Sequence, residues 1–340
     1  MSSPERLLEP LLALHAKIRA AVVDACSRQT AEQLSNVAAD DAGDTIYSID
    51  RIAEDILVDT LGEVAREEPL LLVAEGLPGG ALVLPRGGSK EHCRWQVLVD
   101  PIDGTRGLMY QKRSGWILTG VAPNRGEATR LRDIVLAVQT EIPLLKQHLS
   151  DQLWAMRSAG VSARRFDRLT GTNQPITLRP SSAGTIAHGF ASIVRFFPGA
   201  REVLGGIDDE VLGTLSKPSG AGKALCFEDQ YASTGGQLYE LIAGHDRFIA
   251  DLRPLLRSAY AKQGLPAPLC CHPYDICTGL LAGELGVILT GSGGEPLDTP
   301  FDLATDVAWV GYANASLRAA VEPVLQAALR RRGLLPSPPR

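Results

Sequence analysis

The sequence predicts an α/β (α+β) protein built from two domains. With 340 residues, of which 45% are hydrophobic and 21% charged, the chain is long enough for two domains and has ample material for a core. Two amphipathic helical segments come first, and strand-like apolar runs then predominate from 70 to 180. Beyond 184, strand-like and helix-like segments are mixed. We therefore expect an N-terminal domain over 1–182, a C-terminal domain over 183–333 and a disordered, Pro-rich tail over 334–340.

The composition argues against two classes of partner. The formal net charge is −5 and no basic stripe is interleaved with aromatic residues, so we expect no nucleic acid polymer. The charged residues near the N-terminus do not fit a secretory signal peptide, and no apolar run reaches membrane-spanning length. We therefore expect a cytoplasmic protein with no membrane partner. The cysteines are scattered as in intracellular proteins, and the adjacent pair Cys270–Cys271 lacks the spacing of a zinc knuckle.

Two helices are expected before the first strand of the main sheet. Residues 4–28 begin with Pro4, and their apolar residues recur on one helical face. The spacing of apolar residues from Ile49 to Val64 predicts the second helix, with Asp50 in its first turn. Asp50 either complements the helix dipole or belongs to a functional site, and the helix alone does not decide between these interpretations.

Two predicted strands end on acidic residues. An apolar run over 70–74 ends at Glu75–Gly76. A second run, Val97–Val99, ends at Asp100, because Pro101 cannot continue the ladder of backbone hydrogen bonds. Since open sheets bind ligands at strand ends, the repetition indicates a site.

The motif at 100–105, DPIDGT, adds further polar groups to the second strand end. Asp103 follows Asp100 by three residues, Gly104 allows a tight turn, and Thr105 suits the start of a helix. Carboxylates beside the free amides of a helix start suit a phosphate held between metal ions and that helix. The alternative is that Asp-Pro and Asp-Gly are ordinary turn dipeptides and Thr105 only caps a helix.

The remaining elements follow in order along the chain. Strands are expected at 116–122, 134–140, 153–156, 176–178, 191–197, 248–250, 287–289 and 307–310. Helices are expected at 201–215, after the turn at 231–236, from 272 through Leu285, and from about Leu317 to Arg332 with Gly333 as the stop.

Small residues fill the turn at 231–236, YASTGG. They permit close approach by a ligand, which makes Ser233 and Thr234 candidate substrate contacts. The alternative, that Gly235 and Gly236 only let two elements pack closely, stays open.

Together these features resemble the inositol monophosphatase-like superfamily, which includes inositol monophosphatases, fructose-1,6-bisphosphatases and 3′-phosphoadenosine-5′-phosphate phosphatases. The resemblance covers about 8 to 333 and implies a layered αβαβα sandwich of the inositol monophosphatase or sugar phosphatase type. The residues that carry it are Asp50 at a helix start, a strand ending in Ala74–Glu75, DPIDGT at 100–105, and Tyr274–Asp275 followed by Ala282–Gly283.

The resemblance also implies a metal site. Glu75, Asp100 and the carbonyl of Ile102 would hold one metal ion, and Asp100, Asp103 and Asp275 would hold a second. Oxygen-only ligands select Mg²⁺ over softer metals, so two or three Mg²⁺ ions are expected. Most of these ligands would come from the N-terminal domain, and Asp275 would come from the C-terminal domain.

Further residues would handle the phosphate and the attacking water. The resemblance implies that the amides of Gly104 and Thr105 bind the phosphate, while Glu75 and Thr105 orient the water. Asp50 would form a hydrogen bond with Thr105. Arg106 directly follows this phosphate cradle, and we expect it to bind a second anionic group of the substrate.

The chain departs from the family at several places. The usual Glu-Glu pair is Glu75–Gly76 here, Asn-Phe after DGT is replaced by Arg106–Gly107, and Tyr274 stands where Trp is usual. Extra chain lies between Ala250 and Asp275, and the acidic residue that contacts the inositol ring in the relatives is not evident. These departures leave the substrate open.

The resemblance predicts a Mg²⁺-dependent phosphomonoesterase that hydrolyses an inositol or sugar phosphate by metal-activated water. A 3′(2′),5′-bisphosphate nucleotidase is the alternative among enzymes. A non-catalytic metabolite-binding relative is the alternative from another class, and the complete set of acids argues against it. The expected partner is a small phosphate monoester, and a homodimer is expected because dimers are common in the family.

Overall fold

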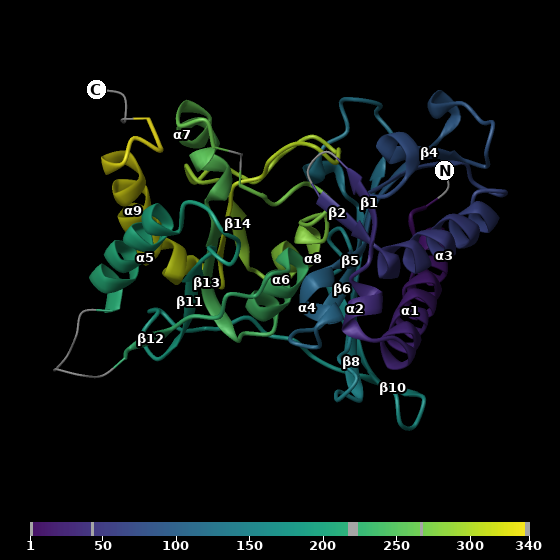
Figure 1. Ribbon diagram of the computed structural model, residues 1–340, viewed down its shortest axis with the longest axis horizontal. Helices are drawn as coiled ribbons and strands as arrows, with labels where there is room; N and C mark the ends of the chain where they lie inside the picture. Colours follow the sequence, from purple (N-terminus) through teal and green to yellow (C-terminus); the bar gives the residue numbers. More distant parts are fainter. Residues whose placement is uncertain (1–2, 42–43, 217–223, 266–267, 337–340) are drawn as a thin grey trace.

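The computed structural model describes residues 3–41, 44–216, 224–265 and 268–336. These residues form two large β-sheets and one small strand pair (Figure 1). The small pair, which leads into the helix that carries Asp50, consists of β1 (Val37–Asp41) and β2 (Asp44–Tyr47).

The first large sheet has the strand order β10-β9-β8-β7-β6-β5-β3-β4. Neighbouring strands run antiparallel except β3 and β5, which are parallel and therefore end at the same edge of the sheet. The strands are β3 (Leu70–Ala74), β4 (Ala81–Leu84), β5 (Trp95–Asp103), β6 (Gly115–Pro123), β7 (Leu136–Ile142), β8 (Leu149–Met156), β9 (Val161–Asp167) and β10 (Thr172–Pro175).

The second large sheet has the strand order β12-β11-β13-β15-β14. Its strands are β11 (Gly189–Ile193), β12 (Cys226–Phe227), β13 (Asp246–Asp251), β14 (Ile288–Thr290) and β15 (Trp309–Tyr312). The helices are α1 (Glu5–Arg28), α2 (Ala31–Leu34), α3 (Ser48–Val64), α4 (Thr105–Met109), α5 (Arg201–Ser216), α6 (Thr234–Ile242), α7 (Arg257–Lys262), α8 (Gly279–Glu284) and α9 (Ala315–Arg331), with short 3₁₀ turns η1 (Pro78–Gly80), η2 (Lys90–His92), η3 (Leu131–Asp133) and η4 (Arg253–Leu256).

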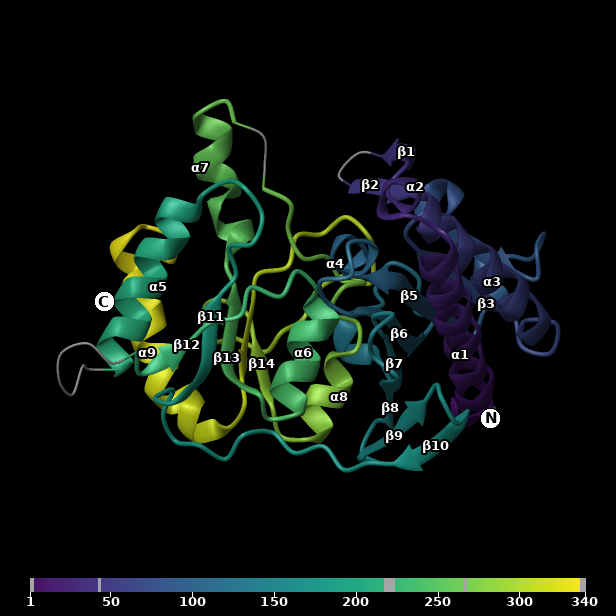
Figure 2. The same ribbon diagram turned by 60° about the horizontal axis from the view of Figure 1, so that its bottom comes forward.

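Helices and sheets alternate in five layers, which confirms the predicted αβαβα sandwich (Figure 2). From right to left in Figure 2, α1 and α3 cover the first sheet, α6 and α8 lie between the two sheets, and α5 and α9 cover the second sheet. The sheet strands are continuous apolar runs because both faces of the sheet are covered, as strand β3 shows. Leu70 and Leu72 pack with α1 and α3, while Leu71 and Val73 face the core between the sheets.

Most predicted elements are present, including both N-terminal helices, the strand ending before Glu75 and the C-terminal helix. The prediction that the second strand ends at Asp100 is wrong, because β5 continues to Asp103. Its pairing with β6 shifts register between Asp100 and Asp103, and this irregularity accommodates Pro101 within the strand.

Two other predictions about elements are also wrong. The apolar segment 176–178 forms no strand, and the sheet instead continues through β9 and β10, whose polar, partly exposed residues gave no apolar signal. The helix expected from 272 begins only at Gly279, so Asp275 lies in the turn before α8.

Two segments complete the outline of the described chain. The extra chain between Ala250 and Asp275 forms η4 and α7, which projects at the top of Figure 2. Of the predicted tail, Leu334 and Leu335 pack against the core, and 337–340 lie outside the described residues. Among the described helices, none has the length and apolar character needed to cross a membrane.

Candidate active site

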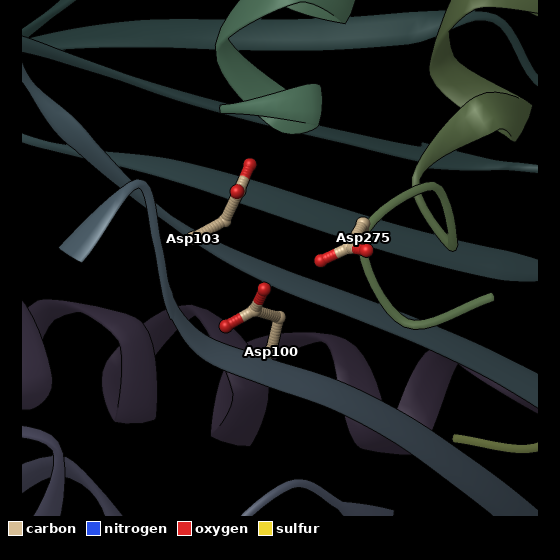
Figure 3. A group of neighbouring side chains, drawn as sticks. All are labelled: Asp100, Asp103 and Asp275. Atoms are coloured by element: carbon tan, nitrogen blue, oxygen red, sulfur yellow. The ribbon is translucent and has the colours of Figure 1, made fainter. Parts of the chain in front are cut away.

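Three aspartates meet where the two halves of the chain face each other (Figure 3). Asp100 and Asp103 come from the end of β5, and Asp275 comes from the turn before α8. Each offers one carboxylate oxygen, and these oxygens all lie within 4.8 Å of one another. The fold therefore brings Asp275 to Asp100 and Asp103, from which it is separated by more than half of the chain.

Hydrogen bonds fix the orientation of each carboxylate. Asp100 Oδ1 accepts from the amide of Ile102 at 3.0 Å, and Asp275 Oδ2 accepts from the amide of His272 at 2.6 Å. Asp103 Oδ2 accepts from the Ser233 hydroxyl at 2.7 Å and from the backbone amide of Gly235 at 2.6 Å. Donors from the N-terminus of α6 therefore hold an aspartate of the first sheet.

Burial makes this group of carboxylates electrostatically costly. Burial raises the pKa of Asp100 well above its ordinary value, and Asp103, Asp275 and Glu75 raise it further. The pKa of Asp275 is raised by burial, then by Asp103 and Glu75. The pKa of Asp103 rises to about 6 through burial, although the bonds from Ser233 and the α6 amides oppose the rise. A divalent cation would offset this repulsion, and three oxygen ligands of this kind fit a hard ion such as Mg²⁺.

Glu75 and Ile102, the other predicted ligands, also lie at this end of the sheet. Glu75 follows β3 directly, and β3 pairs with β5 so that Ala74 lies opposite Val99. This register places Glu75 near Asp100, whose pKa it raises. The carbonyl of Ile102 accepts a hydrogen bond from the Thr105 hydroxyl at 2.7 Å.

Thr105 lies between two acceptors. Its Oγ1 is 3.2 Å from Asp50 Oδ1 as well as 2.7 Å from the Ile102 carbonyl oxygen. Because a hydroxyl has one proton, it donates to one of these acceptors at a time. Asp50 is itself oriented by the amide of Tyr47, which donates to its Oδ2 at 2.8 Å.

Gly104 is required by its conformation and by its surroundings. It precedes α4 with a φ of 84°, in the left-handed region that favours glycine. A Cβ at this position would lie 2.9 Å from the Cβ of Ser233, across the junction between the two halves of the chain. The backbone of the DGT turn can therefore approach α6 only without a side chain.

These groups line one cleft, together with the predicted substrate contacts Arg106, Ser233 and Thr234. The cleft also contains side chains that sequence reasoning missed, chiefly Glu54, Arg253 and the short segments at 196–197 and 269–271. Only the Glu54 position carries a signal in the sequence, because a residue four positions after Asp50 on a helix shares its face.

Glu54 occupies the space beside Gly76, where the resemblance would place a second glutamate. It is 7% exposed, and its Oε2 lies 2.8 Å from Nη1 of Arg51. Burial raises its pKa, and Arg51 opposes that rise. Gly76 has a φ of 81°, and an added Cβ would overlap the Glu54 carboxylate. The carboxylate of Glu54 thus leaves no room for a side chain at position 76.

Arg106 lies between two aromatic rings on the wall of the cleft. Its guanidinium carbon is 5.6 Å from the centre of the Tyr47 ring and 5.5 Å from that of Phe197. Cations over aromatic faces are held by the ring quadrupole, so these contacts restrain the side chain at the cleft.

Comparison with solved structures identifies the fold. An IMPase from Thermotoga maritima superposes with a TM-score of 0.62 at 16% identity, covering 95% of this chain and 98% of that one. The extragenic suppressor protein SuhB of Bartonella henselae gives a TM-score of 0.63 at 15% identity, covering 94% and 98%. The fructose-1,6-bisphosphatase of Leishmania major gives 0.68 at 13% identity, covering 96% and 94%. No protein-family model and no curated protein matches the sequence.

Proposed function

We propose, from a fold shared with inositol monophosphatases and fructose-1,6-bisphosphatases, that this chain is a Mg²⁺-dependent phosphomonoesterase. Its substrate would be a small phosphorylated metabolite of the inositol or sugar phosphate class. The observation that carries the proposal is the group of buried Asp100 and Asp103 and partly buried Asp275, whose oxygens lie within 4.8 Å of one another beside Thr105 and Asp50. Such a group fits divalent cations, and a cleft leads to it.

Five groups of the chain would hold the metal ions. They are the carboxylates of Glu75, Asp100, Asp103 and Asp275 and the carbonyl of Ile102. Bound Mg²⁺ would lower the pKa of a water molecule and neutralise charge on the phosphoryl group. Because the carboxylates raise one another's pKa in the empty cleft, a bound cation would relieve their mutual repulsion.

The chain's own groups would then position the reactants. Asp50 would accept a hydrogen bond from the Thr105 hydroxyl, which would leave the Oγ1 lone pairs free to accept from a water. Glu75 would orient the same water from the end of β3. The amides of Gly104 and Thr105 would donate to the phosphate oxygens. No nucleophilic side chain is needed, because the attacking group is water.

Phosphate release tests this proposal. We expect phosphate release from inositol 1-phosphate or a sugar phosphate in Mg²⁺. We expect no release in EDTA, because EDTA removes the Mg²⁺ that would activate the attacking water. A parallel assay with 3′-phosphoadenosine 5′-phosphate separates the nucleotidase alternative, which would hydrolyse that compound in preference. A folded protein that releases no phosphate from any member of the panel in Mg²⁺ would contradict the proposal and favour the metabolite-binding alternative.

A further inference from the structure

We propose that Arg253 binds a second anionic group of the substrate, so that the substrate carries a carboxylate or a second phosphate besides the phosphate that is removed. This inference rests on the proposed function, because it names the substrate class for the same cleft. Arg253 lies near the start of the extra chain between β13 and Asp275, and no sequence pattern indicates that it reaches the cleft.

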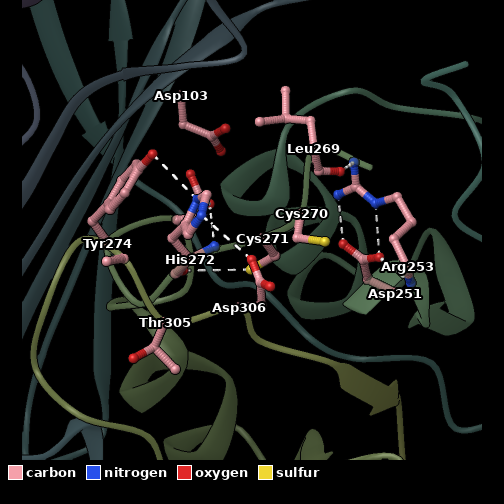
Figure 4. A network of polar contacts seen from close by, with 12 residues as sticks. Asp103, Asp251, Arg253, Leu269, Cys270, Cys271, His272, Tyr274, Thr305 and Asp306 are labelled. Carbon is pink, nitrogen blue, oxygen red and sulfur yellow. Dashed lines mark hydrogen bonds and ion pairs between the residues drawn. The ribbon is translucent and has the colours of Figure 1, made fainter. Parts of the chain in front are cut away.

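The contacts of Arg253 leave part of its hydrogen-bonding capacity unused (Figure 4). Its Nε donates to Asp251 Oδ1 at 2.8 Å, its Nη2 to Asp251 Oδ2 at 2.6 Å, and its Nη1 to the carbonyl of Leu269 at 2.7 Å. A guanidinium has five N–H donors. One N–H on each terminal nitrogen therefore has no acceptor within the described ranges. Because only 5% of the residue is exposed, water in bulk does not readily satisfy these donors.

The orientation of the ion pair places its positive member at the cleft. Arg253 lines the cleft together with Asp275, whereas Asp251, which is 1% exposed, does not. Both oxygens of Asp251 are occupied by Arg253. At this position the cleft is therefore lined by the hydrogen-bond donor Arg253, and the carboxylate of Asp251 lies behind it, outside the lining.

A second guanidinium lies nearby on the same aromatic support. The guanidinium carbon of Arg253 is 4.6 Å from the centre of the Phe196 ring and 5.4 Å from that of Phe197. The guanidinium carbon of Arg106 is 5.5 Å from the same Phe197 ring. The two cations are thus no farther apart than about twice that distance, and both line the cleft.

This wall suits an anion better than a neutral polyol. Sugar and inositol hydroxyls both donate and accept hydrogen bonds, and their recognition uses acceptors as well as donors. Arginine only donates, and its planar group matches carboxylate and phosphate oxygens. The carboxylate paired with Arg253, Asp251, has both oxygens occupied and does not reach the cleft as an acceptor for a hydroxyl.

Matched substrate pairs test the inference. Glycerol 3-phosphate and 3-phosphoglycerate differ by a carboxylate, and glucose 1-phosphate and glucose 1,6-bisphosphate differ by a phosphate. We expect the enzyme to prefer the more anionic member of at least one pair, and the preferred pair identifies the source of the anion. Equal kcat/KM values within both pairs would overturn the inference without affecting the proposed phosphatase activity.

Variants then assign the preference to Arg253. Arg253→Met alone would leave the Asp251 charge buried and unpaired, so the double variant R253M/D251N keeps the test independent of folding. We expect the double variant to lose the preference because KM for the more anionic member rises by about 10- to 100-fold. For the less anionic member, kcat/KM should change little. Arg257→Ala is the control, because Arg257 lies on the same inserted segment as Arg253, pairs with Asp306 and does not line the cleft. Equal losses on both members of a pair would show that Arg253 only anchors the segment.

A binding measurement separates this inference from the proposed function. Calorimetric titration of both pairs with Ca²⁺ in place of Mg²⁺ measures the preference without turnover. Absence of hydrolysis in Mg²⁺ contradicts the proposed function. Absence of tighter binding by the more anionic member, or its retention in R253M/D251N, overturns the role of Arg253.

Discussion

At the scale of single residues, Gly76 shows how the backbone makes room for the site. Its φ of 81° disfavours any side chain, and the Glu54 carboxylate fills the space that a Cβ would need. We expect Gly76→Ala to lower the free energy of unfolding by more than the roughly 1 kcal/mol that the backbone conformation alone costs. Chemical denaturation measures this loss.

A control separates the two causes in Gly76→Ala. Gly79 has a φ of 72° and no atom within 4 Å of an added Cβ, so Gly79→Ala carries the backbone cost alone. The difference between the two variants is the cost of displacing Glu54. If both variants lose the same free energy, the Glu54 contact contributes nothing.

His15 is a second residue with a testable role, far from the cleft. It is fully buried between Thr140 and Thr119, which lie 2.9 and 2.8 Å from its ring nitrogens. Burial, with a smaller contribution from Arg19, lowers its pKa from 6.5 to about 3. His15 therefore binds a proton below about pH 6.5 in the unfolded chain, but only below about pH 3 in the folded protein.

The consequence is a loss of stability with acid. The contribution of neutral His15 is complete above pH 6.5 and is lost as the pH falls toward 3, at about 1.4 kcal/mol per pH unit. We expect His15→Gln, which keeps a polar group but does not titrate, to flatten the pH dependence of the unfolding free energy by one proton in this range. Denaturation at several pH values measures the slope. The same slope in both proteins would contradict the assignment.

At the scale of elements, one residue at the N-terminus of α6 both stabilises that helix and orients an aspartate of the candidate site. Ser233 is its N-cap, accepting from the amide of Gly236 at 2.8 Å, and it also donates to Asp103. We expect Ser233→Ala to lower the unfolding free energy by about 1 kcal/mol and to weaken Mg²⁺ binding by about tenfold. Asn314→Ala removes the N-cap of α9 and should affect stability alone. Unchanged Mg²⁺ affinity in Ser233→Ala, measured by calorimetry, would show that its bond to Asp103 is not needed.

Sequence reasoning found the elements that are continuously apolar or amphipathic. Strands β3 and β5 were predictable because they are buried on both faces, and so was the presence of acids at their carboxyl ends, Glu75 just after β3 and Asp103 as the last residue of β5. Strands β9 and β10 were missed because their polar residues resemble a loop. Pro101 stopped the predicted strand too early, since a register shift that tolerates proline has no local signature.

The candidate site divides in the same way. Asp100, Asp103 and Thr105 are neighbours in one motif, so their proximity followed from the sequence. Arg253 lies about 150 residues further along. It reaches the cleft because β13 ends nearby and its guanidinium packs against Phe196 and Phe197. Contacts of this kind depend on the packing of the two halves and leave no local pattern.

At the scale of the whole molecule, the site lies where the two sheets with their helices meet. The first half supplies Asp100 and Asp103, the second half supplies Asp275 and Ser233, and α6 and α8 fill the layer between the sheets (Figures 1 and 2). A cation at the aspartates would therefore bind both halves at once. The homodimer, the cytoplasmic location and the domain boundary at 182 stay predictions.

The most direct test of the proposed metal site compares Asp100→Asn with the wild type for Mg²⁺ binding by calorimetry and for phosphate release. We expect the variant to stay folded, since the change removes a buried charge, but to bind Mg²⁺ more weakly and to lose at least about 100-fold in phosphate release. Asp246→Asn is the control, because Asp246 is also buried, with its pKa raised to about 7, and lies outside the group of three. Near-wild-type turnover and Mg²⁺ affinity in Asp100→Asn would contradict the assignment of Asp100 as a metal ligand.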